Sequence, residues 1–421
     1  MIILTVISSK NLLKTLGPGI LFASTAIGVS HLVQSTRAGA DYSFGLLVAI
    51  LIANLLKYPF FEYGSRYANS TGTSLIDGYQ KIGKWMLILY FIITISTMFF
   101  VTAAVGMVTA GFMENLFGIQ IPMLMSSVLF MLCLSILLIG KYSILDSLIK
   151  IIGSVLLIST LLAFLLALAH GPSHLQDFGL PQNFWTNKKD IGFLIALMGW
   201  MPTAIDLSTW NSLWTIERIK QTGYKPTMKE TLFDFNFGYI VSALLSICFV
   251  TLGSYMMYGS EIPISNNKAA FANDVVNLYS NTIGQWSYLL IAAAAFSIMF
   301  GTCIAVFDGY SRSMNRCVEL LFQARKTTNT SKKNQLFSLA SLSLGSFLII
   351  YYFSENPKGF KSLIDLATTL SFLIAPVIAI VNFKLVMSYI PTMDKPKIWL
   401  QIISYLGILF LVGFSCYYFI L

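Results

Sequence analysis

Long apolar runs, each about as long as a membrane-spanning helix, follow one another along almost the whole chain. A helix needs about 20 mostly apolar residues to cross the hydrocarbon core of a bilayer. The runs do not alternate with a period of two, as the strands of a membrane barrel would. The pattern therefore predicts an all-α integral membrane protein with eleven transmembrane helices, at residues 12–38, 43–68, 85–113, 121–139, 143–170, 190–219, 232–258, 284–310, 336–354, 363–390 and 398–420.

Two of these runs are interrupted near their middle. The first contains GPGILFASTAIGVSHLVQSTRAGA, in which Gly28 and His31 fall where the bilayer midplane is expected. The sixth contains IGFLIALMGWMPTAIDLSTWNSLW, with Pro202 in its middle and Asp206 just beyond. Proline removes a backbone donor and clashes with the preceding turn, and an ionisable residue inside a span is a functional-site candidate. The sequence therefore predicts that helices 1 and 6 are both broken.

The two breaks lie five helices apart, which is the pattern of an inverted-repeat secondary transporter. An odd number of helices in each repeat gives the two halves opposite orientations in the membrane. We therefore expect a LeuT-like 5+5 inverted repeat within a single transmembrane transporter domain. Residues 1–170 form the first repeat, 190–390 form the second, and 398–420 form an accessory helix.

Composition and charge narrow the class of protein further. Hydrophobic residues make up 56% of the chain and charged residues only 11%, whereas soluble proteins carry about 25% charged residues. This excludes a cytosolic enzyme or a nucleic-acid-binding protein. Placing the N-terminus inside puts 20 of the 27 Lys and Arg residues on the cytoplasmic side, as the positive-inside rule requires. The net charge of +9 is thus explained by the loops of a multi-pass protein of the cell membrane.

Several segments resemble the Nramp family of proton-coupled divalent-metal transporters. GPGILFAS, TRAGADYSFGLLVAILIANLL and RYANSTG are similar to its first two helices. WMPTAIDLS is similar to the methionine-proline break of its sixth helix, and GTCIAVFDGYSRSMN resembles its eighth. The resemblance extends over nearly the whole chain. It implies a metal site between the breaks and a proton path beside it.

The chain departs from the family pattern at the residues that would bind metal. The family's Asp-Pro-Gly-Asn motif matches Gly28, Val29, Ser30 and His31, so the metal carboxylate is replaced. In the sixth helix, Met201 and Pro202 match the family, while two histidines associated with proton movement match Thr203 and Ser208. The resemblance therefore supports the scaffold and the place of the site more than its substrate.

Two substrate classes remain open. Met201 and His31 are the metal-ligand candidates for a manganese- or iron-type ion, although no carboxylate joins them at the matched positions. A small anion such as bicarbonate is the alternative, because helix N-termini and hydroxyl groups favour negative charge. A neutral or organic solute and a receptor role without transport are the remaining possibilities. The expected substrate-binding residues are Gly28, Ser30, His31, Trp200, Met201 and Thr203.

Four further polar residues are candidates for coupling or gating: Asp206, Ser208, Arg37 and Lys57. Lys57 is expected to reach the membrane surface with its amine or to pair with Glu62, and Asp308 is expected to pair with Arg312. The sequence has no ATP-binding loop, HExxH motif or midplane Ser/His dyad, which argues against an enzyme. We expect a small inorganic ion as substrate, proton or sodium coupling, no cofactor and no nucleic acid.

Overall fold

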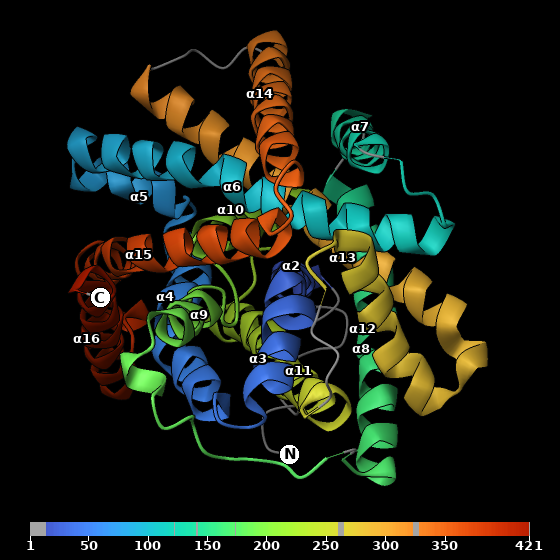
Figure 1. The fold of residues 1–421 in the computed structure, drawn as a ribbon. Helices are drawn as coiled ribbons and strands as arrows, with labels where there is room; N and C mark the ends of the chain where they lie inside the picture. The colour runs from blue at the N-terminus through green and yellow to red at the C-terminus, as the bar shows by residue number, and fades with distance from the viewer. Residues whose placement is uncertain are drawn as a thin grey trace.

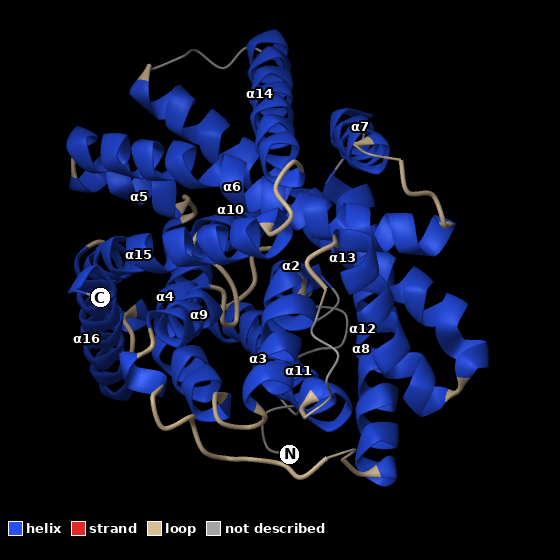
Figure 2. Ribbon diagram, viewed as in Figure 1, coloured by secondary structure: helices blue, strands red, loops and turns tan. Residues whose placement is uncertain are grey.

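The structure is a computed structural model that describes residues 14–121, 123–139, 142–172, 174–259, 265–322 and 328–420. Within these ranges the regular structure is entirely helical (Figure 2). The principal helices are α2 (Pro18–Ala26), α3 (Thr36–Tyr42), α4 (Leu47–Thr71), α5 (Leu75–Ile82), α6 (Lys84–Phe117), α7 (Leu124–Ile139), α8 (Tyr142–His170), α9 (Lys188–Gly199), α10 (Leu207–Thr222), α11 (Met228–Met257), α12 (Lys268–Ile283), α13 (Tyr288–Leu321), α14 (Thr328–Ser354), α15 (Gly359–Ser388) and α16 (Ile398–Ile420). The π-helix η1 (Ser30–Ser35) lies between α2 and α3, and three short 3₁₀ turns complete the set: η2 (Phe184–Thr186), η3 (Gln285–Ser287) and η4 (Thr392–Asp394).

Each apolar run identified in the sequence falls on helical structure. The first run is divided into α2, η1 and α3, and the sixth into α9 and α10, as the interrupted patterns predicted. Seven helices of the described residues are long and apolar enough to cross a membrane. The count of eleven spans, the inside N-terminus and the repeat boundaries remain predictions. Helices α5 and α12 were not predicted, because both are short and lie between the long apolar runs.

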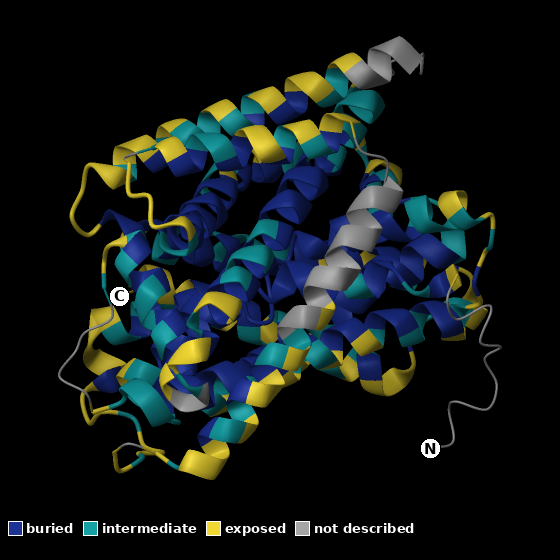
Figure 3. Ribbon diagram, turned by 90° about the vertical axis from the view of Figure 1, so that its right-hand side faces the viewer, coloured by how far each residue is buried: buried dark blue, intermediate teal, exposed yellow. Residues whose placement is uncertain are grey.

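The broken helices lie in the middle of the molecule (Figure 1). Helix α11 packs against α2 and α3, α4 packs against α10, and α6 packs against α13. Buried residues fill this centre (Figure 3). Helices α14 and α16 lie at the periphery (Figure 1) and expose large apolar side chains of the kind that lipid covers. The arrangement therefore surrounds both breaks with packed helices.

A buried carboxylate fixes the start of α2. The side chain of Asp234, on α11, accepts hydrogen bonds from the backbone N–H groups of Gly17 (3.1 Å) and Gly19 (2.7 Å). These N–H groups have no partner within their own helix, and the helix N-terminus carries partial positive charge. Asp234 therefore caps the first half-helix from a neighbouring helix and ties the two together.

Candidate functional site

The first helix is interrupted between Ala26 and Ser30. The chain turns at Gly28, whose N–H donates to the Ala26 carbonyl (2.9 Å), and it resumes as the π-helix η1. A Cβ atom at Gly28 would lie only 2.7 Å from Cγ2 of Thr302 on α13. Gly28 therefore allows α13 to approach the break closely, a packing requirement that the sequence alone did not reveal.

The sixth helix is interrupted between Gly199 and Leu207. Pro202 offers no backbone donor in this segment. A Cβ atom at Gly199 would lie 2.1 Å from the backbone oxygen of Thr368 on α15, so the end of α9 is pressed against another helix. The second half-helix, α10, starts after Asp206, whose backbone oxygen accepts from the Thr209 N–H (3.0 Å). The side chain of Asp206 makes no hydrogen bond that caps α10.

A narrow cavity lies between the two breaks, with α6 and α13 completing its wall. Its volume is about 20 Å³, enough for one water molecule. None of its lining residues is charged, and four of them carry hydroxyl groups. The lining consists of Thr25, Ala26, Val29, Ser30, Val101, Val105, Trp200, Thr203, Ala204, Leu207, Trp210, Thr302 and Val306. Of the six expected substrate-binding residues, Ser30, Trp200 and Thr203 are among them.

Three of the four hydroxyl groups are already occupied as donors. Thr25 donates to the Leu21 carbonyl (2.6 Å), Ser30 to the Ala26 carbonyl (2.5 Å) and Thr302 to the Ser24 carbonyl (3.0 Å). Thr203 makes no hydrogen bond through its hydroxyl within the described part of the chain. The indole N–H of Trp210 is buried and likewise unpartnered there. The lining therefore offers a substrate two donors, both from the sixth helix.

His31 lies beside the break, but it does not line the cavity. Its Nε2 atom is 2.9 Å from the backbone oxygen of Ser242 on α11, and its Nδ1 atom is 2.7 Å from Oγ of Ser30. The ring also makes an edge contact with Phe249. Met201 is buried and does not line the cavity either. The two candidate metal ligands are thus turned away from the space between the breaks in this conformation.

Lys57, on α4, is fully buried against the break in the sixth helix. Its ammonium group donates to three backbone carbonyls, those of Met198 (3.1 Å), Gly199 (2.9 Å) and Thr203 (3.0 Å). The interpretation that Lys57 snorkels or pairs with Glu62 is wrong, because Glu62 instead pairs with Arg66 one turn away. The i,i+4 spacing of Glu62 and Arg66 was the signal that the sequence analysis overlooked.

The remaining coupling candidates on α10 are also buried. One carboxylate oxygen of Asp206 accepts from the Tyr310 hydroxyl (3.3 Å), and the other has no partner among the described residues. Oγ of Ser208 accepts from the amide of Asn382 on α15 (3.0 Å). Asp206 is therefore a buried acceptor that is only half satisfied, next to a cavity with unused donors.

Arg37 lies beyond the first break and joins the first helix to α15. Its guanidinium group donates to Gln34 (2.9 Å) and to Asp365 on α15 (2.7 Å), and it stacks over the ring of Phe193 at 4.7 Å. Gln34 and Asp365 were not singled out in the sequence. An Arg–Asp ion pair therefore joins the first helix to α15.

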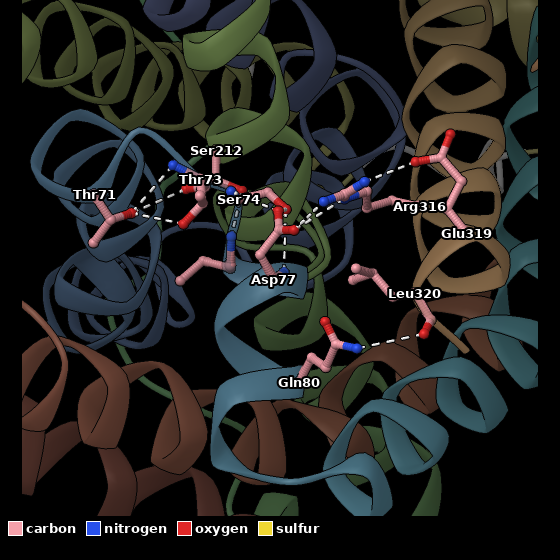
Figure 4. Close-up of polar contacts among 10 residues, drawn as sticks. Thr71, Thr73, Ser74, Asp77, Gln80, Ser212, Arg316, Glu319 and Leu320 are labelled. Atoms are coloured by element: carbon pink, nitrogen blue, oxygen red, sulfur yellow. Dashed lines mark hydrogen bonds and ion pairs between the residues drawn. The ribbon is translucent and has the colours of Figure 1, made fainter. Parts of the chain in front are cut away.

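A second polar network ties α5 to α10 and α13 (Figure 4). Asp77 and Ser74 form a capping box at the start of α5, and Asp77 also accepts from Nε of Arg316 (3.0 Å). The N–H of Leu75 donates to Ser212 on α10 (3.1 Å). Burial by itself raises the pKa of Asp77, but hydrogen bonds from Arg316 and Ser74 outweigh it and lower the pKa below its usual range. We call this set the α5 latch.

The expected pairing of Asp308 with Arg312 is confirmed, at 2.7 Å. Asp308 also accepts from the indole N–H of Trp214 (2.9 Å), which joins α13 to α10. Within the described residues, no group of three or more His, Cys, Asp or Glu side chains is arranged to hold a metal ion.

The comparisons with known proteins are consistent with this architecture. A family model described as natural resistance-associated macrophage protein-like (Nramp) matches residues 19–421. An uncharacterized protein of Pasteurella multocida (strain Pm70) is 36% identical over 402 residues, which cover 95% of this chain and 90% of that protein. The solved structure of the Eremococcus coleocola manganese transporter, in complex with an aromatic bis-isothiourea substituted compound, has a TM-score of 0.72 at 15% identity. That match covers 96% of this chain and 86% of the transporter.

A more distant likeness indicates how widely the fold is shared. MhsT in complex with L-phenylalanine matches with a TM-score of 0.59 at 13% identity, over 94% of this chain and 98% of MhsT. At these identities the structural likenesses show the fold alone, which is that of LeuT-type transporters.

Proposed function

Because the chain belongs to the natural resistance-associated macrophage protein-like family, we propose that it moves a small ion by alternating access, from a site between the breaks in its first and sixth helices. It is a multi-pass membrane protein with the LeuT-type fold of secondary transporters, and not an enzyme. The Arg37–Asp365 pair and the α5 latch serve as the two closures that open in turn. A proton gradient is the proposed driving force.

A small anion such as bicarbonate is the substrate that the cavity favours. The observation behind this choice is that no carboxylate lines the cavity, while two unused donors, the Thr203 hydroxyl and the Trp210 N–H, belong to it. The N-terminal end of α10 adds partial positive charge, since Leu207, its first residue, also lines the cavity. A divalent cation placed there would lose its hydration shell without gaining a counter-charge.

The ammonium of Lys57 strengthens this choice. The carbonyls that the broken sixth helix leaves free are the groups that would otherwise help to coordinate a cation. Two of them, those of Gly199 and Thr203, are already bound to Lys57, together with the Met198 carbonyl. Gly28 stands where the family resemblance places the metal carboxylate, and the amine of Lys57 lies beside the break in the sixth helix.

A divalent metal ion is the second candidate. The family and the manganese transporter among the structural neighbours favour it. In this reading His31 and Met201 turn into the cavity in another conformation, and the unpartnered oxygen of Asp206 supplies the missing charge. His31 would first have to release the Ser242 carbonyl.

Flux measurements on purified protein in liposomes separate the two candidates. We expect saturable uptake of radiolabelled bicarbonate and no quenching of an entrapped metal-sensitive dye by manganese. Thr203→Val, which removes the unused hydroxyl at nearly constant volume, is expected to reduce bicarbonate uptake roughly tenfold, as the loss of a hydrogen bond to a charged group would. Saturable manganese uptake without bicarbonate uptake would overturn the anion proposal.

Thr94→Val is the matched control for this substitution. Thr94 is equally buried, but its hydroxyl donates to the Tyr90 carbonyl of its own helix (2.9 Å), and it does not line the cavity. Its replacement should leave uptake within about twofold of the unmodified protein, because only a local hydrogen bond is removed. Equal losses in Thr94→Val and Thr203→Val would show that the effect of Thr203 is not specific to the cavity.

A further inference from the structure

The ammonium group of Lys57 lies in a site built from backbone oxygens. An ammonium has three N–H donors and no acceptor, and all three donors of Lys57 find carbonyl partners at 2.9–3.1 Å. The side chain is fully buried, and the ring of Phe61 lies 5.8 Å from the ammonium. Lys57 is thus completely satisfied without any contact to water.

The three oxygens are available because the sixth helix is broken. The Gly199 and Thr203 carbonyls accept from no backbone N–H among the described residues, whereas the Met198 carbonyl also accepts from the Met201 N–H (3.3 Å). The C-terminal end of a helix carries partial negative charge as well. Such a set of oxygens is how broken helices bind free monovalent cations in transporters, and rings of carbonyls bind potassium in channels. A lysine from a different helix here takes the place that a free ion would otherwise occupy.

No carboxylate shares this site. Glu62, the nearest acidic residue along α4, is bound to Arg66. Asp206, at the far end of the break, accepts from Tyr310 and makes no ion pair with Lys57 in the described structure. The charge of Lys57 is therefore balanced by backbone dipoles, as the charge of a bound monovalent ion would be.

We propose that Lys57 is a tethered cation, which fills a monovalent-cation site in the break of the sixth helix and takes the place of free sodium or potassium there. Removing the side chain opens a site for an ion of the size of ammonium or potassium. This proposal rests on the broken sixth helix of the proposed function, but it does not depend on which ion is transported.

The test is the thermal unfolding of purified protein in detergent, in chloride salts of choline, sodium, potassium or ammonium at equal ionic strength. The unmodified protein should unfold at the same temperature in all four salts. Lys57→Ala should unfold at a lower temperature in choline, because three buried carbonyls lose their partner. Potassium or ammonium should then restore roughly 3–8 °C in a saturable manner, since an ion that binds only the folded state stabilises it.

Two further variants keep the test decisive. Asn54→Ala removes a buried polar side chain one turn away, whose amide donates to the Ile50 carbonyl of its own helix (2.8 Å), and it should show no preference among the cations. Lys57→Met keeps most of the side-chain volume and is the alternative if Lys57→Ala does not fold. It should be destabilised like Lys57→Ala but gain less from the ions, because its side chain occupies part of the site.

Two results would overturn the proposal. One is a response of the folded Lys57 variants that is identical in all four salts. The other is a saturable sodium or potassium dependence of the unmodified protein. Neither result bears on the flux test of the cavity, because unfolding is measured without any transported substrate. If bicarbonate uptake is absent but potassium or ammonium stabilises Lys57→Ala, the proposed substrate is rejected and the proposal of a tethered cation is retained.

Discussion

The two helix breaks satisfy their polar groups in different ways. In the first break, His31 and Ser30 are bound to each other, and their remaining contacts are with the Ala26 and Ser242 carbonyls. In the second, three carbonyls are bound by Lys57 from another helix, and two buried polar atoms stay unpartnered within the described structure. Those atoms are the indole nitrogen of Trp210 and one carboxylate oxygen of Asp206.

The difference shows which break is free to respond to a substrate. A buried polar group without a partner costs free energy, so it is retained where a ligand or a moving group can use it. The first break has little of this capacity, because its polar atoms are already engaged by the protein. We therefore assign substrate contact mainly to the sixth helix and a structural role to His31.

The largest expected effect compares the two close glycines. Gly199→Ala should prevent folding, at a cost above about 3 kcal/mol, because its Cβ would meet a backbone oxygen that cannot move alone. Gly28→Ala should still fold, because its Cβ would meet the side chain of Thr302, which can rotate. Size-exclusion chromatography of the expressed protein distinguishes them. A well-folded Gly199→Ala beside an aggregated Gly28→Ala would reverse the comparison.

His31→Ala should lower stability by about 2–4 kcal/mol, since it removes a buried ring and its bond to Ser242. His31→Gln, which keeps a donor, should recover part of this loss and retain the substrate affinity. Thermal unfolding together with the KM for uptake measures both quantities. If His31→Gln leaves stability unchanged and raises KM tenfold, His31 belongs to the substrate site and the two breaks are more alike than we infer.

Trp210→Phe tests the unused donor beside the break in the sixth helix. It removes an indole N–H that has no partner among the described residues, but it also shrinks a buried ring that packs against Trp214 and Tyr310, so stability should fall by about 1–3 kcal/mol. Loss of this donor should raise the KM for bicarbonate roughly fivefold, which corresponds to about 1 kcal/mol. An unchanged KM with normal folding would show that the donor of Trp210 is not used.

The smallest expected effect is on the α5 latch. Because this set of residues lies outside both breaks, its effect on stability is a reference for the effects at the breaks. The folded-state pKa of Asp77 is depressed, so its contribution to stability is present above the unfolded-state pKa of about 3.9. That contribution is lost as the pH falls below this value, through the folded-state pKa. Between pH 7 and pH 3, the unfolding temperature should therefore fall more for the unmodified protein than for Asp77→Asn. If the unfolding temperatures of the two proteins change with pH in the same way, Arg316 is not a stabilising partner of Asp77.

The sequence predicted the parts of the fold that depend on one helix at a time. Hydropathy located each apolar run, and Gly28 and Pro202 located the interruptions, because length, apolarity and helix breaking are local properties. The same reasoning brought Ser30, Trp200 and Thr203 to the cavity, since residues at a break face whatever space the break opens.

The parts that it missed depend on how helices face one another. Hydropathy does not give the rotation of α4 against the sixth helix, so the carbonyl partners of Lys57 were not predicted. The turn of His31 toward Ser242 on α11 was missed for the same reason. Thr302 is a further cavity residue from a helix with no interruption, and only the run of small residues around it hinted at close packing.

The π-helix η1 has a consequence for how this chain tolerates insertion and deletion. Each turn of a π-helix holds one more residue than an α-helical turn, so Ser30–Ser35 behaves like an α-helix with one residue inserted. Deleting a single residue there would restore α-helical winding and rotate all that follows by about 100°. Arg37 would then face away from Asp365, with no charged residue changed. A one-residue change in length within η1 is therefore equivalent to removing the Arg37–Asp365 closure.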